Sequence, residues 1–285
     1  MKNDALKAAI ADDVRRALAE DLGAGDVTAA LLPAEGSSAA TVITREDAVL
    51  CGTAWFDTVF AQLDPTVRIS WLEQDGDAIQ AGQELCRLCG PTRALLSGER
   101  CALNFLQTLS ATATATHRYV AAIAGTGAQI LDTRKTIPGL RAAQKYAVRC
   151  GGGRNHRMGL YDAILIKENH IVAAGSIERA ISSARQLSPD LSIEVEVENL
   201  EQLQQALAAH ADSILLDNFA LDDLPAAVTL NAGRARLEAS GGITLANVRD
   251  IASTGVDFIS VGSLTKHIQA IDLSLRVDNS AHCQS

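Results

Sequence analysis

The carboxyl-terminal half of this sequence repeats one pattern, in which a short apolar run ends on a polar residue or a glycine. Six runs follow it: AQILDTR, DAILIK, SIEVEVE, SILLDN, ARLEASGG and DFISVGS. The residues that close them, Asp132, Lys167, Glu196, Asp217, Ser240 and Gly262, stand 35, 29, 21, 23 and 22 positions apart. Each interval has room for a helix, so the pattern predicts repeated strand–helix units. Such a series implies a parallel sheet, and six or more units favour closure into a (β/α) barrel.

The intervals between the runs contain residues that are typical of helix starts. Pro138 can occupy a first helical turn, and Ser176 and Thr244 are candidate N-caps. In a barrel, the carboxyl ends of the strands form the rim where reaction sites lie. An unpaired charge beside apolar strand residues would be costly to bury. We therefore expect Lys167 and the acids that close the next two runs to face one another, or a charged ligand, across a shared cavity.

Residues 1–115 do not follow this repeated pattern. They begin with a charged segment typical of an amphipathic helix, followed by the strand-like runs ATVITRE, AVLCG and VRISWLE. A helix with a leucine stripe is expected from Arg93 to Ala115. These features predict a separate α+β domain. No lysine occurs between Lys7 and Lys135, which excludes a lipoyl or biotinyl carrier.

Positive charge is concentrated between residues 132 and 167, a segment with eight Lys and Arg residues but only two acidic ones. The whole chain, in contrast, has a formal charge of −9. If the barrel forms, five of the basic and imidazole side chains here converge on one rim: Arg134, Lys135, His156, Arg157 and Lys167. Such a cluster suits a small ligand with several acidic groups. Three other cations, Arg141, Lys145 and Arg149, fall at helical spacing and are expected on the solvated face of a helix.

Two glycine-containing turns follow the last two runs: Ser240-Gly241-Gly242 and Val261-Gly262-Ser263. Barrel enzymes often bind phosphate at this position through loop amides and a helix N-terminus. A tight turn would explain either glycine sequence alone. Their joint placement favours a phosphate site.

Charge and hydropathy exclude several other classes of protein. A net charge of −9 and a pI near 5.1 argue against nucleic acid as the main partner. The first residues alternate charged and apolar side chains, so no signal peptide or membrane anchor is expected, and no apolar run approaches the ~20 residues that span a bilayer. The single C-x-x-C, Cys86 to Cys89, lacks the second pair that a zinc site would need. A cytoplasmic protein is expected.

Long motifs resemble the nicotinate-nucleotide pyrophosphorylases (carboxylating), also called quinolinate phosphoribosyltransferases. They are DTRKTIPGLRAAQKYAVRCGGGRNHR, YDAILIKENHI, EVEVEN, LLDNF, EASGGI and VGSLTKH, preceded by EDLGAGDVT and GERCALNFLQ. The resemblance implies an α/β fold with an N-terminal α/β sandwich domain, residues 1–115, on which a C-terminal tail, residues 269–285, packs. It also implies an incomplete (β/α) barrel catalytic domain, residues 116–268, in agreement with six runs rather than eight.

The resemblance further implies an enzyme of NAD biosynthesis that depends on magnesium. It would transfer the phosphoribosyl group of phosphoribosyl pyrophosphate (PRPP) to quinolinate with decarboxylation, giving nicotinate mononucleotide, pyrophosphate and CO2. Magnesium would be bound mainly through PRPP, near Glu196 and Asp217. The expected partners are these two substrates and a second copy of the chain, in a homodimer that shares its active sites.

Family roles transfer to the matching positions of this sequence. Quinolinate would contact Arg134, Lys135, His156, Arg157 and Lys167, with Arg100 supplied by the neighbouring subunit. PRPP would contact Glu196 and Asp217 through its ribose and Ser240, Gly241, Gly262 and Ser263 through its phosphate. Catalysis is expected from Lys135, Lys167, Glu196 and Asp217. Either Lys266 or His267 would also reach PRPP.

Three alternatives remain open on the sequence. Lys167 could form a Schiff base, as in a barrel aldolase. The chain could be a redirected relative, such as the pyrophosphorylase-like proteins linked to molybdate transport, although the intact basic set disfavours a dead site. It could also bind pyridine carboxylates without turnover.

Overall fold

The computed structural model describes residues 3–278, which divide into two compact units. Unit 1 comprises the chain up to Ala115, Ile137–Gly152 and the part from His267 onward, and unit 2 comprises Thr116–Thr136 and Gly153–Lys266. The division falls inside a long helix, α3 (Thr92–Ala122). The structure thus groups residues 137–152, expected in the barrel domain, with unit 1.

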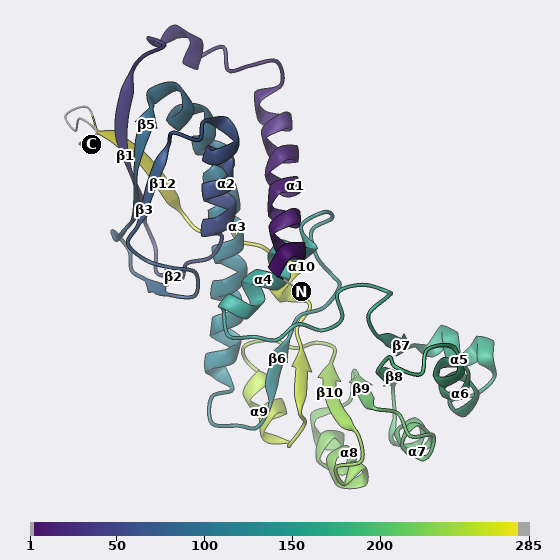
Figure 1. The fold of residues 1–285 in the computed structure, drawn as a ribbon. Helices are drawn as coiled ribbons and strands as arrows, with labels where there is room; N and C mark the ends of the chain where they lie inside the picture. The colour runs from purple at the N-terminus through teal and green to yellow at the C-terminus, as the bar shows by residue number, and fades with distance from the viewer. Residues whose placement is uncertain (1–2, 279–285) are drawn as a thin grey trace. The chain divides into compact units, whose positions relative to one another are not determined.

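Unit 1 is built on a four-stranded antiparallel sheet in the order β12-β1-β5-β3 (Figure 1). The strands are β1 (Ser37–Thr44), β3 (Arg68–Trp71), β5 (Glu84–Pro91) and β12 (Leu273–Asp278), with a small separate pair formed by β2 (Ala48–Val49) and β4 (Ala78–Ile79). Besides α3, the helices are α1 (Asn3–Leu22), η1 (Ala29–Leu31), α2 (Thr53–Leu63) and α4 (Arg141–Cys150).

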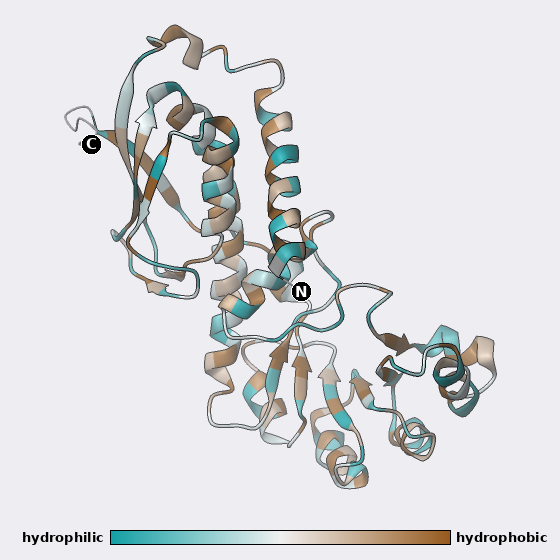
Figure 2. Ribbon diagram, in the orientation of Figure 1, coloured by the Kyte–Doolittle hydropathy of each residue, from teal (hydrophilic) through white to brown (hydrophobic). Residues whose placement is uncertain are grey.

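The core of unit 1 lies between this sheet and the helices. Along β1, Ala40, Val42 and Thr44 are buried at every second position, as expected for a strand with one face packed against helices. Trp55 and Phe56 of α2 are fully buried in the same core. Brown apolar segments of Figure 2 line the sheet and these helices. The sandwich domain predicted from the sequence is therefore confirmed.

The C-terminal tail reaches the sheet of unit 1 as β12, which pairs antiparallel with β1 from Leu273, opposite Thr44, to Asp278, opposite Ala39. Residues 279–285 of the expected tail lie outside the described residues. The described part of the tail contributes an edge strand, so it belongs to the sheet rather than lying on its surface.

Unit 2 contains a six-stranded parallel sheet in the order β6-β11-β10-β9-β8-β7. Its strands are β6 (Gln129–Leu131), β7 (Ile164–Ile166), β8 (Ile193–Val197), β9 (Ser213–Asp217), β10 (Arg236–Ser240) and β11 (Phe258–Ser260). Each corresponds to one apolar run of the sequence. The two edge strands, β6 and β7, do not pair with each other in the described chain, so the sheet is open, as expected for an incomplete barrel.

The connections of unit 2 are helical, as the spacing predicted. They are α5 (Glu168–Ala174), α6 (Ile177–Leu187), α7 (Leu200–Ala208), η2 (Leu221–Asp223), α8 (Leu224–Asn231), α9 (Val248–Ser253) and α10 (Ser263–Lys266). Ser176 caps α6, because its side chain accepts a hydrogen bond from the Arg179 amide at 3.1 Å. The prediction for Thr244 is wrong, since Asn247 occupies the N-cap position of α9.

The segment around α4 also corrects two predictions. Pro138 lies in a turn before the helix, which begins at Arg141, and Gly139 in this turn has a φ of +83°. Lys145 is wholly buried, whereas its helical spacing had placed it on a solvated face. The residues around it, Ala143 and Ala147, belong to the core of unit 1, so this helix is packed on more sides than an amphipathic surface helix.

Buried hydroxyl groups of α3 satisfy the backbone around β2. Ser110 Oγ accepts the Cys51 amide at 2.9 Å and donates to the Cys51 carbonyl at 3.1 Å, and Thr114 Oγ1 accepts the Val49 amide at 2.8 Å. Such bonds matter because an unpaired buried amide loses its hydration without compensation.

We expect Ser110→Ala to lower the free energy of unfolding of unit 1 by about 1–3 kcal/mol, because it leaves the Cys51 amide unpaired in the core. Urea titration followed by tryptophan fluorescence measures this, since both tryptophans, Trp55 and Trp71, lie in unit 1. Thr66→Ala, which removes an exposed hydroxyl from the same unit, serves as the control. Equal effects of the two substitutions would contradict the role of Ser110.

Candidate active site

A cavity of about 430 Å³ lies in unit 2, at the carboxyl ends of its strands. Its walls are formed by Thr133, Arg134, Lys135, His156, Arg157, Leu165, Lys167, Glu196, Leu215, Asp217, Glu238, Ser240 and Ser260. Eight of the residues predicted from the sequence are in this set. The convergence of the strand ends on one rim is therefore observed.

The acidic side of the cavity is formed by Glu196 of β8 and Asp217 of β9. Glu196 makes an ion pair with Lys167, which follows β7 and is the N-cap residue of α5. Burial, followed by the neighbouring charge of Glu196, raises the pKa of Asp217. The Lys167 side chain is therefore engaged by a carboxylate, whereas a Schiff base requires an amine that is free of such a contact.

The cationic side of the cavity brings two guanidinium groups together. Burial, followed by the charge of Arg134, lowers the pKa of Arg157. Arg157 donates to the Ala163 carbonyl at 3.2 Å, while the buried Nε of Arg134 has no hydrogen-bond partner among the described residues. Like charges held together with donors left unpaired in a cavity indicate an anionic ligand.

His156 lies between the cationic side and the interior of the sheet. Its Nε2 is 2.7 Å from Glu194 Oε2 and 3.6 Å from Glu238 Oε2, and its Nδ1 accepts the Arg157 amide at 2.8 Å. Its own amide donates to Asp132 Oδ1 at 2.9 Å. Both ring nitrogens are thus engaged by the protein.

The two glycine turns differ in the room that they leave for a side chain. Gly241 has a φ of +96°, and a Cβ on it would lie 2.1 Å from Asn218 Oδ1. A Cβ on Gly262 would lie 3.1 Å from Cδ of Lys135, so this glycine borders a lysine of the cavity. Thr265 Oγ1 fixes the same lysine by donating to its carbonyl at 2.8 Å.

Some predicted residues are not part of the cavity wall. Ser263 starts α10 immediately after Gly262, and Lys266 ends that short helix. Arg100 is exposed on α3 in unit 1, and His267 is exposed at the start of the last part of unit 1.

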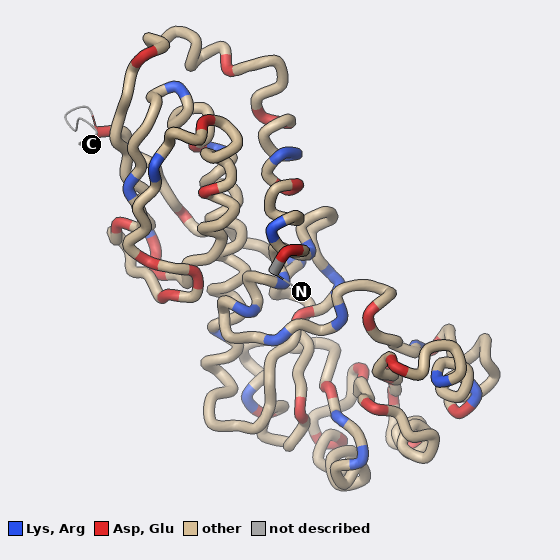
Figure 3. Tube along the Cα trace, in the orientation of Figure 1, with Lys and Arg blue, Asp and Glu red and all other residues tan. Residues whose placement is uncertain are grey.

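The sequence reading missed Glu194, Glu238, Thr133 and Ser260. A signal for the two glutamates was present, because each stands two positions before a predicted residue, Glu196 or Ser240, on the same strand. Alternate residues of a strand point to the same face, so these glutamates had to share the inner face of the sheet. Figure 3 shows acidic positions recurring along the strands of unit 2.

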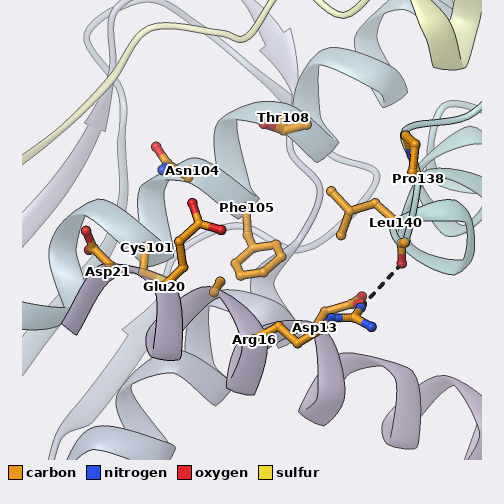
Figure 4. A pocket seen from close by; sticks show the side chains of 12 residues that line it. Asp13, Arg16, Glu20, Asp21, Cys101, Asn104, Phe105, Thr108, Pro138 and Leu140 are labelled. Atoms are coloured by element: carbon orange, nitrogen blue, oxygen red, sulfur yellow. Dashed lines mark hydrogen bonds and ion pairs between the residues drawn. The ribbon is translucent and has the colours of Figure 1, made fainter. Parts of the chain in front are cut away.

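Unit 1 has a cavity of its own, of about 330 Å³, between α1, α3 and the turn before α4 (Figure 4). Figure 4 shows Arg16, Glu20 and Phe105 at its wall. Asp13, also in the wall, is occupied by bonds to Arg16 at 2.6 Å and to the Trp55 indole at 3.1 Å. The cavity lacks the gathered cations of unit 2, so it is the weaker candidate for an anion site.

Comparison with known proteins agrees with this geometry. The family model for the C-terminal domain of quinolinate phosphoribosyl transferase matches residues 112–276. The family model for its N-terminal domain matches residues 26–110. This chain belongs to the quinolinate phosphoribosyltransferase family. The resemblance noted in the sequence is thereby confirmed.

Relatives of the family are similar over nearly the whole chain. A probable nicotinate-nucleotide pyrophosphorylase (carboxylating) of Bacillus subtilis is 44% identical over 259 residues, 90% of each chain. The corresponding enzyme of Mycobacterium leprae is 43% identical over 274 residues, 93% of this chain and 95% of its own. The solved structure of the nicotinate-nucleotide pyrophosphorylase of Francisella tularensis has a TM-score of 0.93 and 50% identity, covering 95% of this chain and 97% of that one.

Across the part of the chain that the structure describes, no helix combines the length and the apolar character needed to span a bilayer.

The crowding of Arg134 and Arg157 generates a prediction for the ligand-free protein. We expect Arg134→Gln to leave unfolding unchanged or raise its free energy by up to about 1 kcal/mol, because it relieves repulsion between the two guanidiniums. The same substitution should abolish the thermal stabilisation that an aromatic 2,3-dicarboxylate gives to the wild type. Thermal unfolding with and without the diacid tests both effects, with Arg276→Gln on the exposed side of β12 as the control. Stabilisation by the diacid that survives in Arg134→Gln would contradict this assignment.

Proposed function

We propose that this chain is a quinolinate phosphoribosyltransferase that joins quinolinate to the ribose of PRPP with loss of CO2. The observation that carries the proposal is the cavity of unit 2, whose wall contains Arg134 and Arg157 together with the acidic pair Glu196 and Asp217. One side of the cavity suits a diacid, and the other suits a ribose whose anomeric carbon becomes positive.

The cationic side would hold quinolinate. Planar guanidinium groups match carboxylates by paired hydrogen bonds, and the unpaired Nε of Arg134 offers a donor for this purpose. Lys135, beside Gly262, would lie between the two substrates. Fixed cations also stabilise the electron pair left on the ring carbon when the 2-carboxylate departs, without reorganisation of solvent.

The acidic side would hold PRPP. As pyrophosphate leaves, the ribose carbon gains positive charge, which the carboxylates of Glu196 and Asp217 would stabilise. The same carboxylates accept hydrogen bonds from ribose hydroxyls. The turns at Ser240-Gly241 and Gly262-Ser263 would bind the 5′-phosphate through their backbone amides.

Magnesium would enter with PRPP, bound to its pyrophosphate oxygens, and would shield the charge of the leaving group. The residues present fit this mode of entry. Because Glu196 is already paired with Lys167, the described residues of the cavity wall form no preformed cage of free carboxylates for the ion. The oxygen donors are therefore expected mainly from the substrate.

We also propose a cytoplasmic homodimer in which each active site is completed by the partner's copy of Arg100. The exposure of Arg100 on α3 leaves its guanidinium available for such a contact. The proposal assigns no role in binding nucleic acid or membranes, in keeping with the acidic charge of the chain.

The proposed activity is tested with purified protein, quinolinate, PRPP and magnesium by measuring nicotinate mononucleotide and CO2. We expect turnover with quinolinate and at least about 100-fold lower kcat/KM with nicotinate, because the monoacid leaves one cationic partner of the cavity unpaired. Calorimetric binding of quinolinate without any product would favour a sensor or a redirected relative. Equal turnover of the two acids would contradict the specificity.

The shared active site is tested by mixing two inactive variants. We expect Arg100→Ala and Lys167→Ala to lose at least about 100-fold in kcat/KM each, since each removes a charge-assisted contact, while Lys7→Ala on the exposed face of α1 retains activity. Exchange of subunits between the two inactive variants should restore activity, because mixed dimers contain one intact site. No recovery after verified exchange would contradict the sharing of residues between subunits.

A further inference from the structure

The inner face of the sheet in unit 2 carries a buried cluster of three titratable side chains at the wall of the cavity. One ligand atom each from His156, Glu194 and Glu238 lie within 4.8 Å of one another. The glutamates are 8% and 2% exposed. Two carboxyl groups in contact and out of water cannot both be charged without a large cost, so their protonation is a structural property of the site.

Hydrogen bonds fix the tautomer of His156. The Arg157 amide donates to Nδ1 at 2.8 Å, so Nδ1 presents a lone pair and carries no proton. Nε2 lies 2.7 Å from Glu194 Oε2 and therefore carries the ring proton and donates it. This hydrogen-bond geometry corresponds to the neutral imidazole.

The same bonds argue against a metal ion at this cluster. A metal on Nε2 would need the lone pair of that nitrogen, and the ring proton would then have to sit on Nδ1. Nδ1 is an acceptor for the Arg157 amide and has no room for a proton. The cluster is therefore a hydrogen-bond network rather than a metal centre.

The partners of the two glutamates differ. Glu194 accepts hydrogen bonds from His156 and, at 3.1 Å, from Ser213 Oγ. Glu238 Oε1 is buried and has no partner among the described residues, which is costly for a charged oxygen. Burial, followed by the charge of Glu194, raises the pKa of Glu238 to about 8. Glu238 is therefore the member that keeps its proton.

We propose that Glu194 and Glu238 hold one proton between them at neutral pH, and that this pair positions neutral His156 and, through it, the backbone of Arg157 at the anion site. Glu238 donates to Glu194, and Glu194 accepts from His156. The inference rests on the proposed function only for its effect on substrate. Both glutamates are positioning residues, since each acts through His156.

The charge balance of the site explains why one proton is retained. The single charge of Glu194 offsets part of the repulsion between Arg134 and Arg157, and it acts to raise the pKa of Arg157. A second negative charge, on Glu238, would neutralise cations that the diacid needs. The groups that face Glu238 are Glu194 from β8, His156 from the loop before β7 and the Ser260 hydroxyl from β11. His156 and Ser260 favour the ionised form of Glu238, but burial and the charge of Glu194 outweigh them.

Two substitutions of Glu238 test the proposal by kinetics. Glu238→Gln keeps an uncharged donor of the same shape, whereas Glu238→Leu keeps the volume without a donor. We expect kcat/KM for quinolinate to be at least about 10-fold higher in Glu238→Gln than in Glu238→Leu, with the difference mainly in KM. The wild-type KM should rise between pH 7 and pH 9 as Glu238 ionises, and Glu238→Gln should lose this rise. Equal damage by both substitutions, or an unchanged rise in Glu238→Gln, would overturn the proposal.

Two measurements need no substrate and separate this proposal from the proposed function. A carboxyl whose pKa is raised by folding gives stability that is lost as the pH climbs through its folded value. The melting temperature of the wild type should therefore fall, relative to Glu238→Gln, as the pH rises from 4.5 to about 8, and should change in parallel with it at higher pH. Nitrogen-15 NMR of labelled histidine, with His156→Gln for assignment, should show the neutral Nε2–H tautomer at pH 7. The proposed network would be contradicted by an imidazolium at His156, or by the same pH dependence of the melting temperature in the wild type and in Glu238→Gln. Either result would count even if the enzyme turns over quinolinate. Conversely, both results could be positive in a protein that lacks that activity.

Discussion

The alternation of side chains along the parallel strands of unit 2 is the constraint on which its site depends. Strands of a parallel sheet are usually apolar on both faces, since helices or a packed interior cover them. Here Val195 and Val197 of β8, and Leu237 and Ala239 of β10, are buried and apolar, while the residues between them are polar. One face therefore supplies packing and the other supplies a chemical surface. On these two strands the open sheet tolerates polar residues because they border a cavity, whose wall also includes Leu165 and Leu215.

Polar residues on an inner face are stable only when their charges balance locally. Lys167 is held by Glu196, and the guanidinium pair is offset by Glu194 beneath it. The positive charge is not fully compensated by the described residues, since the buried Nε of Arg134 has no hydrogen-bond partner among them. A site with excess positive charge favours the binding of an anion, and this excess lowers the stability of the ligand-free protein.

The sequence predicted the strands of unit 2 well because each run combines an apolar stretch with a polar end. Ser176 was also predictable, since a serine before a helical pattern has few other roles. The missed features depend on tertiary packing. Lys145 has the helical spacing of a surface residue, and only the packing around α4 buries it. The grouping of residues 137–152 with unit 1 has the same origin, because local pattern does not specify the partner of a helix. Glu194 and Glu238 were not predicted because each lies inside a strand, two positions before the polar residue near its end. A local apolar pattern does not indicate a buried acid at such a position.

The burial of Glu238 shows why a site for anions can retain an acid. An apolar residue at this position would pack without any cost of desolvation, but it would leave Glu194 with one donor fewer. A basic residue would satisfy Glu194 but would cancel the negative charge that offsets the repulsion between the two guanidiniums. A neutral carboxyl meets both demands, since it donates a hydrogen bond and adds no charge. Its limit is set by pH: above a pKa of about 8 the donor becomes a second anion, and the network loses the hydrogen bond and the charge balance together.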